Sequence, residues 1–182
     1  FPDTLVGHGE AIVRPRISTQ FDYEGELAIV IGRTARHVSA ARALDHVAGY
    51  TCFLDGSVRD WQRHTTQFTP GKNFPATGGC GPWFVTTDEI PDPAVLRLTT
   101  RVNGEVLQQA PVSDLCFGVR RIVEQCTGVC TLNPRDIIAT GTPSGVGFAR
   151  MPPRWLKPGD TVEVEIEGIG ILRYNVVDEA AS

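Results

Sequence analysis

The sequence predicts a mixed, β-rich α+β fold built as one domain, with one long helix and a few short ones. Nineteen Gly and thirteen Pro are spread along the 182 residues, a composition typical of many short strands joined by turns. Apolar side chains recur at sustained helical spacing only over residues 113–128. No repeat or change of composition marks a boundary, so residues 1–182 are expected to form a single domain.

The first part of the chain predicts two strands separated by a short helix. Residues 1–20 show no period and are expected to be irregular. Residues 21–32 predict a strand whose second half, a continuous apolar run, is buried on both faces. Ser39 precedes good helix formers, so a short helix is expected over 39–47 before a second strand at 48–54.

A helical turn and a long loop follow the second strand. Ser57 is a suitable cap for a helical turn over 58–62. Residues 63–82 are polar and rich in Gly, and they form the longest expected loop of the chain. Loops of this length are usually functional or disordered, so this segment is a candidate for carrying site residues.

A hairpin and the long helix come next. Residues 96–102 alternate as a half-buried strand, Asn103-Gly104 is the strongest two-residue hairpin signal, and residues 105–108 return the chain. The helix is expected to start at Ser113 and to stop at Gly128, a natural C-terminal glycine.

The remaining elements are strands. Residues 136–140 predict a short strand that enters a Gly-rich turn at 141–147. The chain ends in two alternating strands, 162–166 and 171–177, and the glutamates of the first are expected to form a solvated face.

Charge, hydropathy and cysteine content argue against several classes of protein. Seventeen Lys and Arg against twenty-one Asp and Glu leave a net charge of −4, so nucleic acid is not an expected partner. The longest apolar runs, such as 27–31, are far shorter than the roughly 20 residues of a membrane span. Five cysteines at irregular spacing and no signal-peptide pattern predict a reducing cytoplasm. Cys126 and Cys130 lie one helical turn apart, but without a partner motif buried thiols are favoured over metal ligands.

Glu24-Gly25-Glu26 is the first pattern that suggests chemistry. Side chains alternate along a strand, so both carboxylates project from one face, and Gly25 leaves the backbone between them open. Two like charges repel unless a hard cation neutralises them, and Asp55 at the end of the second strand is a reasonable third ligand. An isolated pair of this kind more often simply faces water, so the spacing alone leaves both alternatives open.

Cations lie in or beside the long loop. Lys72 and Arg59 can receive a substrate carboxylate or an oxyanion, although exposed basic loop residues are usually only solvated. The four histidines fit no metal-binding pattern, and none is assigned a ligand role. Residues 141–147 lack the ending of a phosphate-binding loop, so we expect a tight turn that presents Thr142 to a site.

Seven blocks, taken together and in order, strongly resemble the fumarylacetoacetate hydrolase family, over about residues 5 to 177. The blocks are Asp22 to Gly32, Val47 to Thr51, Asp55 to Gln62, Gly71 to Phe74 with Gly81 to Trp83, Val102 to Glu105, Asp136 to Gly147, and Leu156 to Val162.

The resemblance implies a β-sandwich or roll particular to this family, usually in a homodimer. It implies a divalent ion, Mg²⁺ or alternatively Mn²⁺ or Ca²⁺, held by Glu24, Glu26 and Asp55. It also implies a set of catalytic or substrate-side residues, namely Arg59, Gln62, Lys72 and Thr142. The expected partner is a small oxo-acid substrate.

The family resemblance implies a metal-dependent enzyme, and three functions are kept open. The first is a hydrolase that cleaves a carbon–carbon bond in a β-diketo acid such as an acylpyruvate or a fumarylacetoacetate-like compound. The second is an isomerase or decarboxylase of an oxo-dienoic acid in aromatic catabolism, similar to 2-hydroxyhepta-2,4-diene-1,7-dioate isomerase. The third is a β-rich binding module in which the carboxylates hold a structural Ca²⁺ and nothing reacts.

The general base for hydrolysis is expected outside this sequence. Hydrolytic family members resemble one another in a His and Glu pair on a lid well upstream of the metal-binding strand, a position that falls before Phe1. The only Met is Met151, so residue 1 is not an intact translation start, and either the chain is processed or an N-terminal segment precedes Phe1. If residues before Phe1 are present, we expect them to include that lid. His8 and Glu10 lie too close to the strand to match it.

Overall fold

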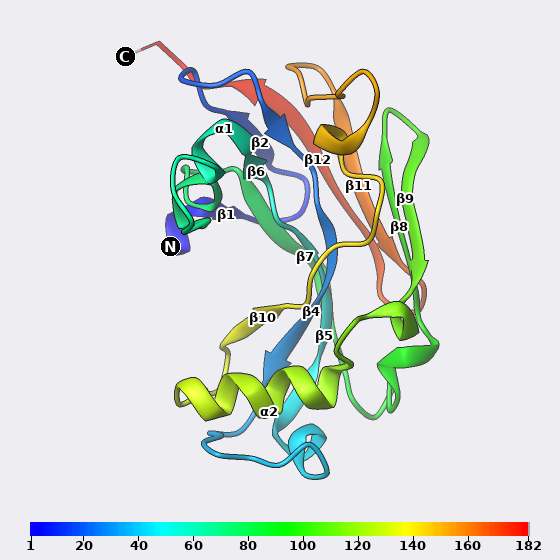
Figure 1. The fold of residues 1–182 in the computed structure, drawn as a ribbon. Helices are drawn as coiled ribbons and strands as arrows, with labels where there is room; N and C mark the ends of the chain where they lie inside the picture. The colour runs from blue at the N-terminus through cyan, green and yellow to red at the C-terminus, as the bar shows by residue number, and fades with distance from the viewer. Residues whose placement is uncertain (182) are drawn as a thin grey trace.

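A computed structural model describes residues 1–181, and it confirms a β-rich architecture in which two sheets pack against each other (Figure 1). The first five-stranded sheet has the order β1 (Leu5–Val6), β7 (Gly78–Thr86), β5 (Val47–Leu54), β4 (Gly25–Ile31), β10 (Ile137–Ala139). The second has the order β2 (Ala11–Arg14), β12 (Gly170–Asp178), β11 (Thr161–Ile166), β8 (Arg97–Val102), β9 (Glu105–Pro111). A two-stranded ribbon pairs β3 (Phe21–Asp22) with β6 (Ser57–Val58).

Helices are few and mostly single turns. The long helix α2 (Val119–Val129) lies across one end of the first sheet in Figure 1 and buries Val119, Val123 and Thr127, one helical turn apart. The four-residue helix α1 (Arg59–Gln62) follows β6 directly. Six 3₁₀ turns complete the set: η1 (Pro2–Thr4), η2 (Ala43–His46), η3 (Thr69–Lys72), η4 (Pro93–Val95), η5 (Val112–Asp114) and η6 (Gly147–Ala149). Within residues 1–181 no helix has the length and apolar character needed to cross a bilayer.

The core lies between the two sheets, and alternation along the strands explains it. In β11 the side chains of Val162, Val164 and Ile166 are buried. The glutamates between them point outward as expected, and two of them form ion pairs, Glu163 with Arg173 and Glu165 with Arg101. Period-two alternation therefore gives this strand one apolar face for the core and one charged face.

Three strands lie where the sequence predicts irregular chain, so these expectations are wrong. β1 and β2 fall within residues 1–20, and β7 begins inside the expected loop at 63–82. The glycines of β7 have low strand propensity, so the sequence does not predict a strand there. The packing requires Gly79, however, because a Cβ at this residue would lie 2.0 Å from Tyr174 Oη. The expected strand at 21–32 is also divided, since β3 pairs with β6 whereas β4 pairs with β5.

The helix boundaries also differ from expectation. The long helix starts at Val119 with Gly118 as its N-cap, because the residues after Ser113 form the turn η5. The helix expected over 39–47 is reduced to the single turn η2. Cys126 lies in α2 and is half-buried, whereas Cys130 is the C-cap and is exposed, so the buried-thiol expectation fails for Cys130.

Two buried tyrosines give a matched test of the core. Tyr174 Oη donates to Val6 O at 3.0 Å, whereas Tyr50 Oη has no hydrogen-bond partner within residues 1–181. We expect Tyr174→Phe to lower the free energy of unfolding by about 1–3 kcal/mol, because the Val6 carbonyl loses its partner. Tyr50→Phe should change it by less than about 0.5 kcal/mol or raise it. Urea unfolding measures both, and an equal loss in the two variants would contradict this interpretation.

Candidate metal-dependent active site

Three carboxylates converge at the end of β4, as the sequence predicts. Glu24 immediately precedes β4, Glu26 lies on it, and Asp55 follows β5. The antiparallel pairing of the two strands continues through a hydrogen bond from Asp55 N to Glu24 O at 2.9 Å, which aligns the third carboxylate with the first two. One oxygen atom from each side chain lies within 4.8 Å of the others.

Gly25 makes the convergence possible by facing the other way. A Cβ at this position would lie 2.0 Å from Thr100 Oγ1 and 3.3 Å from a methyl group of Val164 in the second sheet. Because neighbouring residues on a strand point to opposite faces, close packing of Gly25 turns both glutamates away from the core. The sequence argument expected Gly25 to leave the backbone between the carboxylates open, whereas the structure requires a glycine there because Thr100 packs against it.

Lys72 reaches the carboxylates from the turn η3. Its Nζ donates to Glu24 Oε2 at 2.7 Å, to Asp55 Oδ2 at 2.6 Å and to Ser57 Oγ at 2.6 Å. The Lys72 side chain is mostly buried, so the alternative that Lys72 is only a solvated loop residue does not hold. A fixed cation in contact with two of the three carboxylates is positioned for charge stabilisation.

Arg59 and Gln62 form the second basic element of the site. Arg59 is almost fully buried, and its Nη2 lies 2.6 Å from Glu24 Oε1. Its Nε donates to Asp22 Oδ2 at 2.8 Å and its Nη1 to Gln62 Oε1 at 2.9 Å. Both residues lie on one face of α1, since they are three positions apart. The structure therefore brings Arg59 to Glu24 and places Gln62 against Arg59, and their substrate-side role stays a prediction.

The turn after β10 closes the opposite side of the cluster. Gly141 N donates to Glu26 Oε2 at 2.8 Å, and Thr142 Oγ1 donates to Gly25 O at 2.9 Å. Thr142 Oγ1 also accepts from Gln108 Nε2 at 2.8 Å. Gly141 has φ +102°, a backbone conformation that favours glycine. The turn thus places Thr142 beside the site, although its hydroxyl is engaged by the protein's own backbone and by Gln108.

The electrostatics fit a divalent cation. Burial raises the pKa of Glu26 to about 8, and the nearby Asp55 carboxylate adds to the rise. Burial also raises the pKa of Asp55, against the lowering effect of Lys72. Within residues 1–181 the only hydrogen bond to the Glu26 carboxylate comes from Gly141 N. An all-oxygen set with an unmatched, desolvated carboxylate is the donor chemistry that Mg²⁺, Mn²⁺ or Ca²⁺ takes.

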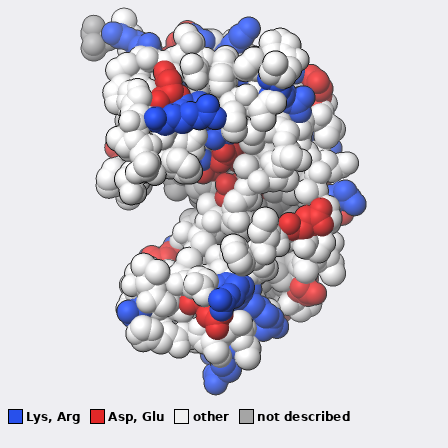
Figure 2. Space-filling view, viewed as in Figure 1, with Lys and Arg blue, Asp and Glu red and all other residues white. Residues whose placement is uncertain are grey.

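The cluster opens on a concave surface. Figure 2 shows acidic side chains inside a hollow on one side of the molecule, with Lys or Arg side chains on the rim above them. A cavity of about 560 Å³ is lined by Asp55 and Lys72 together with Arg135 and Ile137. This space is large enough for a small organic acid.

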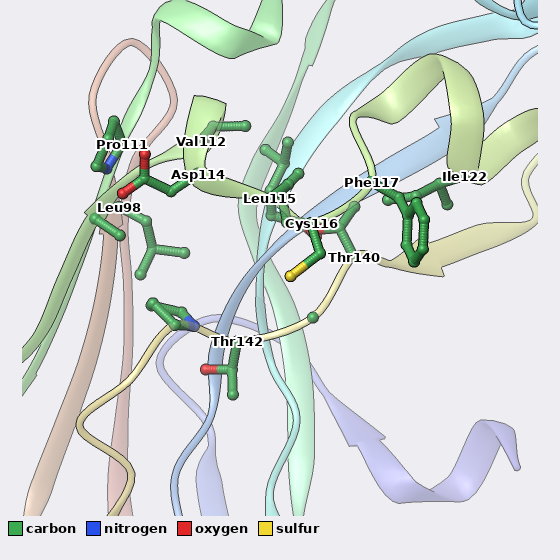
Figure 3. Close-up of a pocket in the computed structure, with 14 residues that line it drawn as sticks. Leu98, Pro111, Val112, Asp114, Leu115, Cys116, Phe117, Ile122, Thr140 and Thr142 are labelled. Atoms are coloured by element: carbon green, nitrogen blue, oxygen red, sulfur yellow. The ribbon is translucent and has the colours of Figure 1, made fainter.

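A second cavity, of about 230 Å³, lies on the other face of β4 (Figure 3). Its lining is mainly apolar, with Leu27, Leu115 and Phe117 among its residues, and Thr142 borders it. Leu27 and Glu26 are adjacent on β4 and so point to opposite faces of the sheet. Within residues 1–181 the apolar cavity therefore meets the carboxylate cluster only at the Gly141–Thr142 turn, which borders both, and we place the chemistry in the acidic hollow.

The sequence analysis did not identify Asp22, which holds Arg59 of the site in place. Asp22 is fully buried and accepts from Arg59 Nε, from Gly147 N at 2.8 Å and from Phe148 N at 3.0 Å. Its carboxylate therefore fixes α1 and η6 relative to β3. Asp22 lies in one of the family blocks, but nothing in its local pattern distinguishes it from an exposed strand-end aspartate.

Removal of Asp22 gives a test of this support. We expect Asp22→Ala to lower the free energy of unfolding by about 3–5 kcal/mol, because the buried Arg59 guanidinium loses a partner and two backbone donors become unsatisfied. Asp88→Ala, at an exposed position, should cost less than about 0.5 kcal/mol. Denaturant unfolding of both variants measures the difference, and a cost below about 1 kcal/mol for Asp22→Ala would contradict this role.

Comparison with known proteins agrees with this geometry. The fumarylacetoacetate (FAA) hydrolase C-terminal family matches residues 1–177. A protein of Archaeoglobus fulgidus is 46% identical over 95% of this chain and 65% of its own length. The oxaloacetate tautomerase YisK of Bacillus subtilis is 42% identical over 96% of this chain and 58% of its own length. The chain thus spans about three fifths of these relatives.

Solved structures show the same fold. The 5-carboxymethyl-2-hydroxymuconate delta-isomerase of Mycobacterium smegmatis superposes with a TM-score of 0.90 at 41% identity, over 98% of this chain and 67% of that one. A fumarylacetoacetate hydrolase of Exiguobacterium antarcticum gives a TM-score of 0.92 at 41% identity, over 98% of this chain and 64% of that one. With its sheets, its carboxylates and its sequence all in agreement, this chain belongs to the fumarylacetoacetate hydrolase family.

Proposed function

We propose that this chain is the catalytic region of a Mg²⁺-dependent enzyme that interconverts the keto and enol, or dienol, forms of a small 2-oxo dicarboxylic acid. The observation that carries the proposal is the contact of Lys72 Nζ with two of the three converging carboxylates, at 2.6 and 2.7 Å. Two oxaloacetate tautomerases, a 5-carboxymethyl-2-hydroxymuconate delta-isomerase and a probable 2-hydroxyhepta-2,4-diene-1,7-dioate isomerase, at 35–42% identity, support this reaction class.

The residues have separable tasks in such a reaction. Glu24, Glu26 and Asp55 would hold the ion, which supplies Lewis-acid polarisation of the 2-oxo group when bound. Lys72 stabilises negative charge on the substrate oxygen as the enolate develops. Arg59, held by Asp22 and Gln62, provides a fixed cation beside the ion ligands for a substrate carboxylate. Keto–enol interconversion moves one proton between carbon and oxygen and breaks no carbon–carbon bond.

Hydrolysis of a carbon–carbon bond is the second candidate. It is supported by the resemblance to the fumarylacetoacetate hydrolase of Exiguobacterium antarcticum and to a maleylpyruvate hydrolase of Sphingobium, at 41% and 34% identity. Hydrolysis also needs a water molecule activated by a general base. Among residues 1–181, no histidine donates to or accepts from the three carboxylates, and His64 instead stacks on Trp61 with ring centroids 4.7 Å apart.

Two parallel assays separate the candidates. Loss of the enol absorbance of oxaloacetate reports tautomerisation, and pyruvate released from acetylpyruvate, measured with a coupled dehydrogenase, reports hydrolysis. We expect Mg²⁺-dependent tautomerisation to exceed pyruvate release. Faster Mg²⁺-dependent pyruvate release would favour the hydrolase. Absence of both activities in a protein that binds Ca²⁺ would favour a non-catalytic module.

Calorimetry tests the ion ligands. We expect Glu26→Gln to weaken Mg²⁺ binding by at least about 100-fold, since even supporting residues around a metal typically contribute 10–100-fold. Glu167→Gln, at an exposed position outside the cluster, is the matched control and should bind Mg²⁺ as the parent does. Unchanged affinity in Glu26→Gln would show that the ion binds elsewhere.

Steady-state kinetics test Lys72. If its ammonium meets charge that develops only in the transition state, Lys72→Ala should lower kcat by roughly 10²-fold and change KM much less. Release of Glu24 and Asp55 from their cation can alter metal affinity as well, so the assay is run at saturating Mg²⁺. A change confined to KM would assign Lys72 to ground-state binding of the substrate carboxylate.

A further inference from the structure

Two guanidinium groups share one aromatic ring at the edge of the site. Arg59 Cζ lies 4.5 Å from the centroid of the Phe148 ring, and Arg63 Cζ lies 4.6 Å from the same centroid. Each of these distances lies within the range of favourable cation–π interaction with the ring. Together they place the two guanidinium groups no more than about 9 Å apart. Phe148 therefore links an exposed arginine to one in contact with an ion ligand.

The two arginines differ in how their charge is balanced. Arg59 is paired with Asp22 and Glu24 inside the protein. The side chain of Arg63 is exposed and forms no ion pair or side-chain hydrogen bond with any residue from 1 to 181. Like charges four positions apart on a helical turn repel each other, so stacking on Phe148 holds Arg63 where its own charge is not compensated. Such a group is ready to bind an anion.

The position of Arg63 beside the candidate active site indicates that this anion is part of a ligand bound there. Arg63 is the C-cap of α1 and follows Gln62 directly, the residue that accepts from Arg59. Through Phe148, the Arg63 guanidinium also lies no more than about 9 Å from that of Arg59, which contacts the ion ligand Glu24. A short acid with one end at the carboxylate cluster and Arg59 can therefore extend its other end toward Arg63.

We propose that Arg63 binds the distal carboxylate of a 2-oxo dicarboxylic acid and thereby selects dicarboxylic over monocarboxylic substrates. This inference rests on the proposed function, since it assumes that the 2-oxo acid end lies at the ion ligands. A guanidinium presents paired N–H donors that match the two oxygens of a carboxylate, and Phe148 fixes the plane of that group. Arg63 is thus a specificity residue and takes no part in the proton transfer.

Binding of three acids to the Mg²⁺-loaded protein tests the assignment by calorimetry. Oxalate reports the ion site alone, whereas 2-oxoglutarate and 2-oxopentanoate differ only in the distal carboxylate. We expect the parent to bind 2-oxoglutarate about 10- to 100-fold more tightly than 2-oxopentanoate, the range of a charge-assisted bidentate contact. Arg63→Gln should reduce this preference to less than about 2-fold and leave oxalate and 2-oxopentanoate binding unchanged.

Controls distinguish the possible failures. Arg97→Gln removes an exposed arginine on β8 and should keep the parental preference, whereas Arg63→Lys should retain part of it. A preference that persists in Arg63→Gln would overturn the role of Arg63 and leave the proposed function intact. Failure of the parent to bind oxalate in the presence of Mg²⁺ would overturn the proposed function and this inference together.

Discussion

The close approach of Gly25 to the Thr100 side chain is the contact on which the site depends. It brings β4 of the first sheet so near to β8 and β11 of the second that no side chain fits at that position. The pleat of the strand then sends the carboxylates on either side of Gly25 outward, and pairing with β5 adds Asp55. The close packing of the two sheets at Gly25 thus also assembles the acidic cluster.

Concentrating negative charge in this way is unfavourable, and the surrounding structure offsets it. Within residues 1–181, Asp22, Glu24 and Asp55 form ion pairs with two cations, Arg59 and Lys72, and Glu26 forms none. Asp22 is fully satisfied by Arg59 and backbone N–H groups, so the unmatched charge falls on the three outward carboxylates. A divalent ion is the group that this imbalance suits.

Local patterns identified much of the fold and the site. The Asn103-Gly104 hairpin, the alternating β11 and the E-x-E spacing each depend on nearby residues, and the structure confirms them. β7 was missed because it is rich in glycine, and one of these glycines, Gly79, is required by the packing of Tyr174, a residue far away in the sequence. Asp22 was missed for a similar reason, since its partners come from α1 and η6 and no spacing rule connects them. The grouping of Arg59, Lys72 and Thr142 came from family resemblance and not from spacing.

The hydrogen bonds of Asp22 also bear on how the chain folds. Its partners lie 37 residues away at Arg59 and 125 residues away at Gly147. Contacts that join distant segments require long loops to close before they contribute, so proteins rich in them fold slowly. During synthesis, the carboxylates near residue 24 emerge long before the backbone donors at Gly147 and Phe148 that hold Asp22, the partner of Arg59. The supported acidic cluster therefore forms late, after most of the chain has left the ribosome, and the growing chain presents only separate, solvated acids.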